Sequence, residues 1–268
     1  MILWKITLRK LQEVERLVDL MVCEIQKLKR KRNFLFVLGT AVLFPIPIAV
    51  LVIVNSYNMK NIFAMLVMLG DGFMLPLALI FFSMIILGEE TENDTLKNMY
   101  LIPISARKIV LAKLITLVLF AVCYSTVSMI VAFGIGMLAG NISGIASDFG
   151  MNLLICCMMC FAVLPFVSFV MNRKSNYVIE GISGFLFVTI NFVFIGTITP
   201  MPVVLAPFLP IASIYRLFLP EVAVVRTVYV DNIAMPINIF LVSICITIIF
   251  SIVMIERAYR RKASRWHL

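Results

Sequence analysis

The sequence contains few charged residues for its length of 268 residues. Only 14% of the residues are Asp, Glu, Lys or Arg, whereas about a quarter is usual in a soluble domain. So few charges cannot cover a water-soluble globule of this size, and 62% of the residues are hydrophobic. Lipid is therefore expected to contact much of the surface. Spans with short loops take up these residues, so no soluble ATP-binding domain is expected among them.

Motifs for catalysis and metal binding are also missing from the sequence. It has no GxxxxGK[ST] phosphate loop and no HExxH zinc motif, and His267 is its only histidine. Cys157 and Cys160 form a CxxC inside an apolar run, but a zinc site needs about four ligands and no second pair accompanies them. We therefore expect no catalytic residue, no metal and no cofactor bound by this chain, and we do not expect an enzyme.

The basic residues have an uneven distribution. The net charge is +9, yet all but three of the 23 Lys and Arg residues fall on one side of the topology given below. The exceptions are Lys60, Arg216 and Arg226. Basic residues gather in cytoplasmic loops, so this pattern places both termini of a multi-pass cell-membrane protein in the cytoplasm. The interleaved basic and aromatic residues of a nucleic-acid-binding protein are not present.

Six long apolar runs predict an all-α membrane protein with six transmembrane helices. A transmembrane helix needs about 20 predominantly apolar residues, and each run has this length. The transmembrane domain extends over residues 34–256, and a basic cytoplasmic tail follows at 257–268. The predicted spans cover residues 34–54, 62–87, 109–138, 151–171, 177–196 and 236–255.

Residues 1–33 are predicted to form a cytoplasmic amphipathic helix and a basic anchor. Trp4 suits the lipid headgroup region, and a mostly basic run at 27–32 directly precedes the first span. The pattern favours a helix in the inner membrane interface, and a short coiled coil or a solvated helix is the alternative. Met21 is an alternative start of the chain. The apolar residues that share one face of this helix are Leu11, Val14, Val18, Met21, Ile25 and Leu28.

A proline-rich apolar segment at 197–235 is expected on the outer side, between the fifth and sixth spans. Each proline lacks a backbone donor and disturbs the preceding helical turn, so one continuous span is disfavoured. Short helices that re-enter the outer leaflet fit this pattern better. Such an element is either an outer gate or exit lid, or a plain packing element. The prolines concerned are Pro200, Pro202, Pro207, Pro210 and Pro220.

Asp71 is the one acidic residue well inside a predicted span, between Gly70 and Gly72. An intramembrane acid indicates a functional site, here a contact to a cationic substrate or an ion. A structural hydrogen bond between helices, or a position near the outer interface, is the alternative. Other polar residues within spans are expected to hydrogen-bond between helices, namely Ser125, Thr126, Ser128 and Asn191.

The segment after the second span carries the most functional information. Residues 92–102 are predicted to form a short amphipathic helix that projects into the cytoplasm between two membrane helices. An apolar face on such a helix suits docking in a groove of a soluble partner, and a capped cytoplasmic loop without a partner is the alternative. The residues assigned to this element are Glu89, Glu92, Asp94, Thr95, Leu96, Met99, Tyr100 and Pro103.

This segment resembles the type-2 ABC exporter permeases, the ABC-2 family. In that family an acidic residue, a TLKNLL element and a PISR element follow the second of six spans. The chain has Thr95-Leu96-Lys97-Asn98-Met99-Tyr100 and then Pro103-Ile104-Ser105-Ala106-Arg107-Lys108, with its basic pair one residue later. The six spans, the N-terminal helix and the outer element extend the resemblance over nearly the whole chain. The chain size and the Glu24-Ile25-Gln26-Lys27-Leu28-Lys29 opening are similar to the lantibiotic-immunity and bacitracin-resistance permeases.

The resemblance implies the membrane-spanning permease subunit of an ATP-driven exporter. Such a subunit pairs with a second permease subunit, which is the same or a different chain, and the short helix after span two binds a cytosolic ABC ATP-binding subunit. ATP and Mg²⁺ would bind to that partner. The implied cargo is an antimicrobial peptide or another amphipathic compound. An ion-coupled secondary carrier and a non-transporting sensor or scaffold subunit are the alternatives, although a carrier usually has internal repeats and this sequence shows none.

Overall fold

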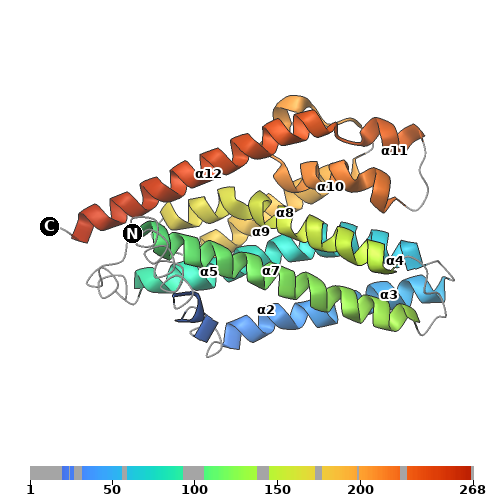
Figure 1. Ribbon diagram of the computed structural model, residues 1–268, viewed down its shortest axis with the longest axis horizontal. Coiled ribbons are helices and arrows are strands. Elements are labelled where there is room, and N and C mark those ends of the chain that lie inside the picture. The colour runs from blue at the N-terminus through green and yellow to red at the C-terminus, as the bar shows by residue number, and fades with distance from the viewer. Residues whose placement is uncertain are drawn as a thin grey trace, which may run out of the picture.

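The computed structural model of the chain describes residues 20–23, 25–26, 32–55, 59–92, 106–137, 145–172, 177–197, 199–223 and 228–266 (Figure 1). Within these ranges the regular structure is entirely helical. Six helices are long and apolar enough to cross a membrane, which confirms the predicted all-α class and the number of spans. These segments are Phe34–Val54, Lys60–Ile86, Leu111–Met137, Ser147–Val170, Val178–Gly196 and Ile237–Ala258.

The first two spans are interrupted helices. The first consists of α2 (Arg32–Leu43) and α3 (Pro45–Val54), because Pro45 has no backbone N–H to continue the hydrogen-bond ladder of α2. The second span begins as α4 (Met59–Met65), continues as a π-helical segment, η1 (Leu66–Met74), and ends as α5 (Leu75–Glu92). The wider π-helical turn therefore occurs inside the membrane-spanning part of the chain.

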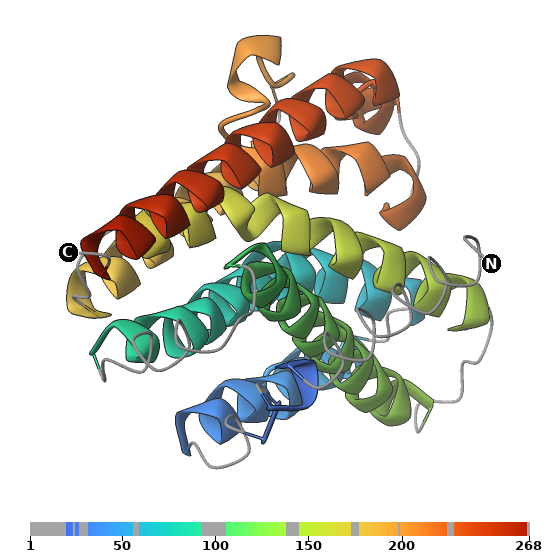
Figure 2. The ribbon, with the colours of Figure 1, turned by 60° about the vertical axis from the view of Figure 1, so that its left-hand side comes forward.

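The third to sixth spans are long helices arranged around α8. They are α7 (Ala106–Met137), α8 (Ile145–Asn172), α9 (Tyr177–Gly196) and α12 (Ile237–Trp266). α8 packs against α5, α7 and α12 (Figure 2). The second and fourth spans are the most buried, whereas the first, fifth and sixth leave most of their apolar surface exposed. In a membrane this exposed surface is suited to contact with lipid or with a second subunit.

Aromatic packing joins the first three spans. The rings of Phe82 on α5 and Phe120 on α7 stack with centroids 4.0 Å apart. Phe34 on α2 lies against both rings, at centroid distances of 5.8 Å and 5.9 Å. Aromatic pairs at such separations stabilise a core beyond the area that they bury. This cluster holds the start of the first span against the second and third spans.

A close contact at Gly184 sets the position of α9. A Cβ atom on this residue would lie 2.6 Å from Cγ2 of Ile80 on α5 and 3.1 Å from the ring of Phe166 on α8. Glycine therefore allows α9 to approach both helices, as small residues do at many membrane helix contacts.

We expect Gly184→Ala to destabilise the bundle by about 1–3 kcal/mol, because the β-branched Ile80 cannot move aside without a backbone shift. Thermal unfolding of the purified chain in detergent measures the effect. Gly134→Ala on α7 is the matched control, since an added Cβ there meets nothing within 4 Å. A Gly184→Ala midpoint equal to that of the control would contradict this account of the packing.

The segment between the fifth and sixth spans contains three short helical elements. They are η2 (Val203–Leu205), α10 (Pro210–Val222) and α11 (Val228–Ile233). The 13 residues of α10 are too few to cross a bilayer, which needs about 20. α10 packs against α8, α9 and α12. The predicted re-entry of this segment into the outer leaflet stays a prediction.

Two predicted elements lie wholly or mainly outside the described residues. Residues 20–23 and 25–26 are helical, and the remainder of the predicted N-terminal helix is outside the description. The predicted coupling helix at 92–102 is described only at Glu92, the last residue of α5.

Candidate functional site

Asp71 lies in the π-helical segment, near the middle of the second span. This segment extends from Leu66 to Met74, and Gly70 and Gly72 flank the acid. A Cβ atom on Gly72 would approach Cδ1 of Ile195 on α9 to 3.0 Å, so glycine permits close packing between this segment and the fifth span. Segments of π-helix are rare and frequently occur at functional sites. The π-helical backbone and the intramembrane acid therefore both indicate a functional site at this position.

The carboxyl group of Asp71 is buried without a hydrogen-bond partner for one of its oxygens. The side chain is 4% exposed, and Oδ2 accepts no hydrogen bond from any residue that the structure describes. The Asp71 carboxyl group is therefore enclosed by the helix bundle and is not on its surface. A buried polar atom without a partner is costly, so its presence calls for an explanation.

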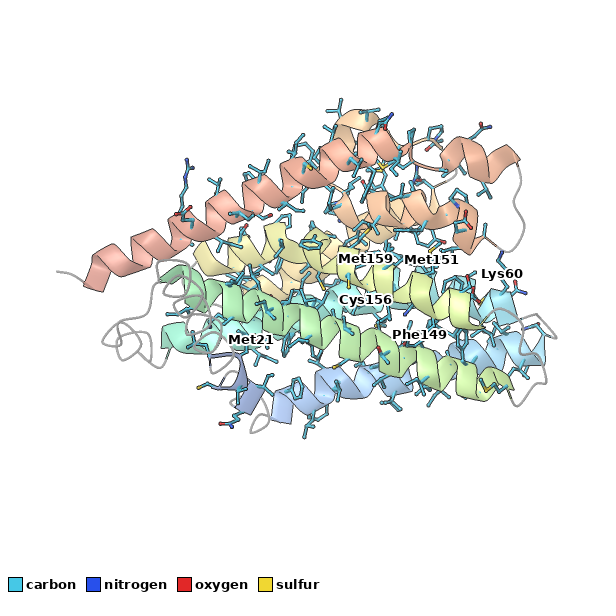
Figure 3. The ribbon with its side chains drawn as sticks, viewed as in Figure 1. Met21, Lys60, Phe149, Met151, Cys156 and Met159 are labelled. Atoms are coloured by element: carbon cyan, nitrogen blue, oxygen red, sulfur yellow. The ribbon has the colours of Figure 1, made fainter. Side chains whose placement is uncertain are left out.

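Polar side chains of the third and fourth spans face Asp71. The hydroxyl of Tyr124 on α7 and the thiol of Cys156 on α8 are both within electrostatic reach of its carboxylate. The Tyr124 hydroxyl also lies 3.0 Å from Oγ1 of Thr40 on α2. Cys156 is located in the middle of the bundle, and Lys60 at one end of it (Figure 3). Polar groups of the second, third and fourth spans therefore gather inside the bundle, and Thr40 connects the first span to them through Tyr124.

A hydrogen bond between the third and fourth spans extends this cluster. Asn152 on α8 donates its amide N–H to Oγ of Ser125 on α7, and Cys156 lies next to the same hydroxyl. Oδ1 of Asn152 is buried and has no partner among the described residues. Two buried oxygens of the cluster, on Asp71 and Asn152, thus have no donor among the residues that the structure describes.

The fifth span and α10 cap each other's ends. Oδ1 of Asn191 on α9 accepts the backbone N–H groups of Ile211 at 3.2 Å and Ala212 at 3.4 Å. These donors belong to the first turn of α10, where no N-cap side chain is bonded. Asn191 therefore satisfies groups that a local capping residue usually satisfies. The expected hydrogen bonding between helices is confirmed for Ser125 and Asn191, and no bond to Thr126 or Ser128 occurs in the described part of the chain.

Arg216 on α10 makes the reciprocal contact at the end of α9. Its guanidinium donates to the backbone oxygens of Phe194 at 2.8 Å, Thr197 at 3.0 Å and Thr199 at 2.9 Å. It also donates to Oγ1 of Thr197 at 2.7 Å. Burial lowers the pKa of Arg216 and raises the pKa of its neighbour Tyr215 to about 12. A positive charge at the C-terminus of α9 also interacts favourably with the helix dipole.

Most of the residues predicted to couple the chain to an ATPase lie outside the residues that the structure describes. Glu89 and Glu92 belong to the last turn of α5, and the other predicted residues lie between α5 and α7. The two flanking helices are joined near this point, since Nζ of Lys113 on α7 donates to the backbone oxygen of Ile86 on α5 at 3.1 Å. This buried lysine ties together the helices from which the predicted element would project.

Sequence reasoning singled out Asp71 but missed most of the groups around it. Tyr124, Asn152 and Cys156 are separated from Asp71 by more than fifty residues, and no motif connects them. Asn152 could have been identified from the sequence, because it is a polar residue within an apolar run. Arg216 gave a comparable signal as a basic residue in the apolar outer segment, but its role as a helix cap depends on the folded arrangement.

These features define a multi-pass helical membrane protein with polar side chains inside its bundle. A family model described as ABC-2 family transporter protein matches residues 20–196. The match covers well over half of the chain and ends with α9, so the chain belongs to the ABC-2 family and is the permease component of an ABC transporter. No match was found among curated proteins.

Proposed function

We propose that the chain is the permease of an ATP-driven exporter that moves an amphipathic compound, such as an antimicrobial peptide, out of the membrane. Membership of the ABC-2 family supports the transporter class. The observation that favours an amphipathic cargo is the exposed apolar surface of the outer segment. Val203 and Val204 are 58% and 78% exposed, and Phe208 is 72% exposed. Apolar side chains exposed in this way are suited to contact acyl chains or the apolar face of a peptide.

The energy source in this proposal is a cytosolic ABC subunit that binds ATP and Mg²⁺. It would contact the element whose coupling residues are Glu89, Glu92, Asp94, Thr95, Leu96, Met99, Tyr100 and Pro103, and a second permease subunit would complete the pathway. Closure of the ATP-binding subunits would move this element, and Lys113 would transmit the motion because it joins α5 to α7. The chain itself makes and breaks no covalent bond, and transport is a shift between conformations that the partner drives.

Copurification tests this proposal. We expect the full-length tagged chain, extracted from its native membrane, to retain an ABC ATP-binding protein that mass spectrometry identifies. In proteoliposomes, an exported peptide should stimulate ATP hydrolysis by the complex, which a sensor or scaffold subunit would not require. Recovery of the chain without any ATPase would contradict the exporter assembly. Unchanged peptide sensitivity of cells that lack the gene would contradict the choice of cargo.

A further inference from the structure

We propose that the polar cluster around Asp71 is a binding site for a cation of single positive charge. The cation is either an ion from solution or the ammonium group of a cargo molecule. This inference goes beyond the exporter function, since a binding site can be measured without ATP and without a known cargo. Four observations carry it, namely the unpartnered oxygens, the placement of the nearby cations, the composition of the cluster and the form of the backbone.

The first observation is that two buried acceptors lack donors. Oδ2 of Asp71 and Oδ1 of Asn152 have no hydrogen-bond partner in the described part of the chain, and the residues are 4% and 1% exposed. Both atoms are closed off from the surface of the bundle. Buried acceptors in this state favour a bound donor or cation.

The second observation is that nearby cationic side chains are used elsewhere. Arg216 donates to the backbone at the end of α9, and Lys113 donates to the backbone of α5. Lys60 is exposed and lies within electrostatic reach of Asp148. No ion pair to Asp71 occurs among the described residues, and its titratable neighbours Tyr124 and Cys156 are weak acids that supply no positive charge. Among the described residues, the carboxylate therefore has no counter-ion.

The third observation is the composition of the cluster, which restricts the class of cation. The one carboxyl group among the described residues of the cluster is that of Asp71, and Tyr124, Ser125 and Asn152 contribute neutral oxygens to the cluster, so its charge when Asp71 is ionised is a single negative one. The described residues contain no group of three or more His, Cys, Asp or Glu side chains that could hold a metal ion, which disfavours a transition metal. A single negative charge and oxygen ligands match a monovalent cation or a primary ammonium.

The fourth observation is the π-helical backbone that carries Asp71. The Leu66–Met74 segment departs from the α-helical hydrogen-bond pattern inside the bundle. Irregular backbone at membrane depth is tolerated where protein buries it, and broken helices contribute carbonyl oxygens to cation sites in transporters. The segment also packs against α9 and α10, so occupancy of the site would be coupled to the position of the outer segment.

Thermal unfolding of the full-length chain in phosphatidylcholine nanodiscs tests the proposal. Midpoints are compared at constant pH and ionic strength in the chlorides of sodium, potassium, ethylammonium and N-methylglucamine. We expect at least one of the first three to raise the wild-type midpoint by about 2–4 °C over N-methylglucamine, the bulkiest of the four cations and the reference. Sodium or potassium alone would identify a solution ion, and ethylammonium alone would identify a cargo ammonium.

Three variants separate binding from a structural role. Asp71→Asn keeps the shape and removes the charge, so its midpoint should not depend on the cation. Asn152→Ala should reduce the shift, and Glu221→Gln, at an exposed acid on α10, should retain it in full. An equal shift in wild type and Asp71→Asn would overturn the proposal, as would the absence of any shift in wild type. A wild-type midpoint that depends on pH but not on the cation would identify a protonated structural carboxyl and would equally overturn it.

Discussion

Replacing Arg216 by methionine is expected to lower the thermal unfolding midpoint of the chain by about 5–10 °C, because three backbone oxygens and one hydroxyl each lose the hydrogen bond that Arg216 donates. Methionine fills much of the same volume but cannot donate. The Phe194 carbonyl lies in the last turn of α9, where a helix leaves its oxygens without partners. We estimate the destabilisation at about 2–4 kcal/mol, after allowance for the desolvation of the guanidinium.

Two further variants sharpen this prediction. Arg216→Lys keeps the charge but loses the planar fork, so its midpoint should lie between wild type and Arg216→Met. Lys60→Met removes an exposed basic residue and should change the stability by no more than about 0.5 kcal/mol. In a double-mutant cycle, Thr197→Val should cost less in the Arg216→Met background, because the hydroxyl bond is already lost. Arg216→Met with the wild-type midpoint would show that the contacts to α9 are not stabilising.

Combining Leu96→Asp with Tyr100→Asp is expected to abolish recovery of the ATP-binding subunit with the tagged chain. The two residues lie on the apolar face of the predicted coupling helix, and two new carboxylates would have to be buried in the contact. Unpaired charges buried at an interface cost several kcal/mol, which is enough to dissociate a complex of moderate affinity. Mass spectrometry of the copurified proteins and the ATPase activity of the sample measure the result.

A matched pair of single variants distinguishes the docking face from the general effect of an added acid. Leu96→Asp places one carboxylate on the predicted apolar face, whereas Asn98→Asp places one on the opposite side of the same helix. The first should weaken recovery of the partner and the second should not. Both chains should show the wild-type yield and unfolding midpoint, because the predicted coupling helix projects away from the membrane helices. Equal recovery in the two variants would contradict a docking helix at this position.

The caps between α9 and α10 have a consequence for motion. Asn191 of α9 holds the start of α10, and Arg216 of α10 holds the end of α9, so the two helices are joined at both ends of their contact. A pair fixed in this way moves more easily as one body than as two. Thr247 on α12 adds a bond to the backbone oxygen of Pro207 at 3.2 Å, which links the sixth span to the same unit. Any displacement of the outer segment would therefore also displace the fifth span.

The span count was predictable from the sequence, and the centre of the second span was not. Long apolar runs identify membrane helices because the lipid core imposes a length of about 20 residues and forces backbone groups to bond within each segment. The same reasoning marked Asp71 as an intramembrane acid. It gave no indication of π-helical geometry, because no residue pattern in Leu66–Met74 specifies a π-helical turn.

The sequence by itself determined that this protein resides in a membrane, that it crosses the membrane with six helices, and that it resembles the ABC-2 permeases. Each of these properties depends on local composition or on a contiguous motif, and none of them requires knowledge of which helices are in contact. Only the tertiary structure decided that Tyr124, Asn152 and Cys156 meet near Asp71, and that Asn191 and Arg216 cap neighbouring helices. Between apolar helices in lipid, hydropathy is equal on most faces, so pairing depends on side-chain shape and a few polar contacts that the order of residues does not reveal.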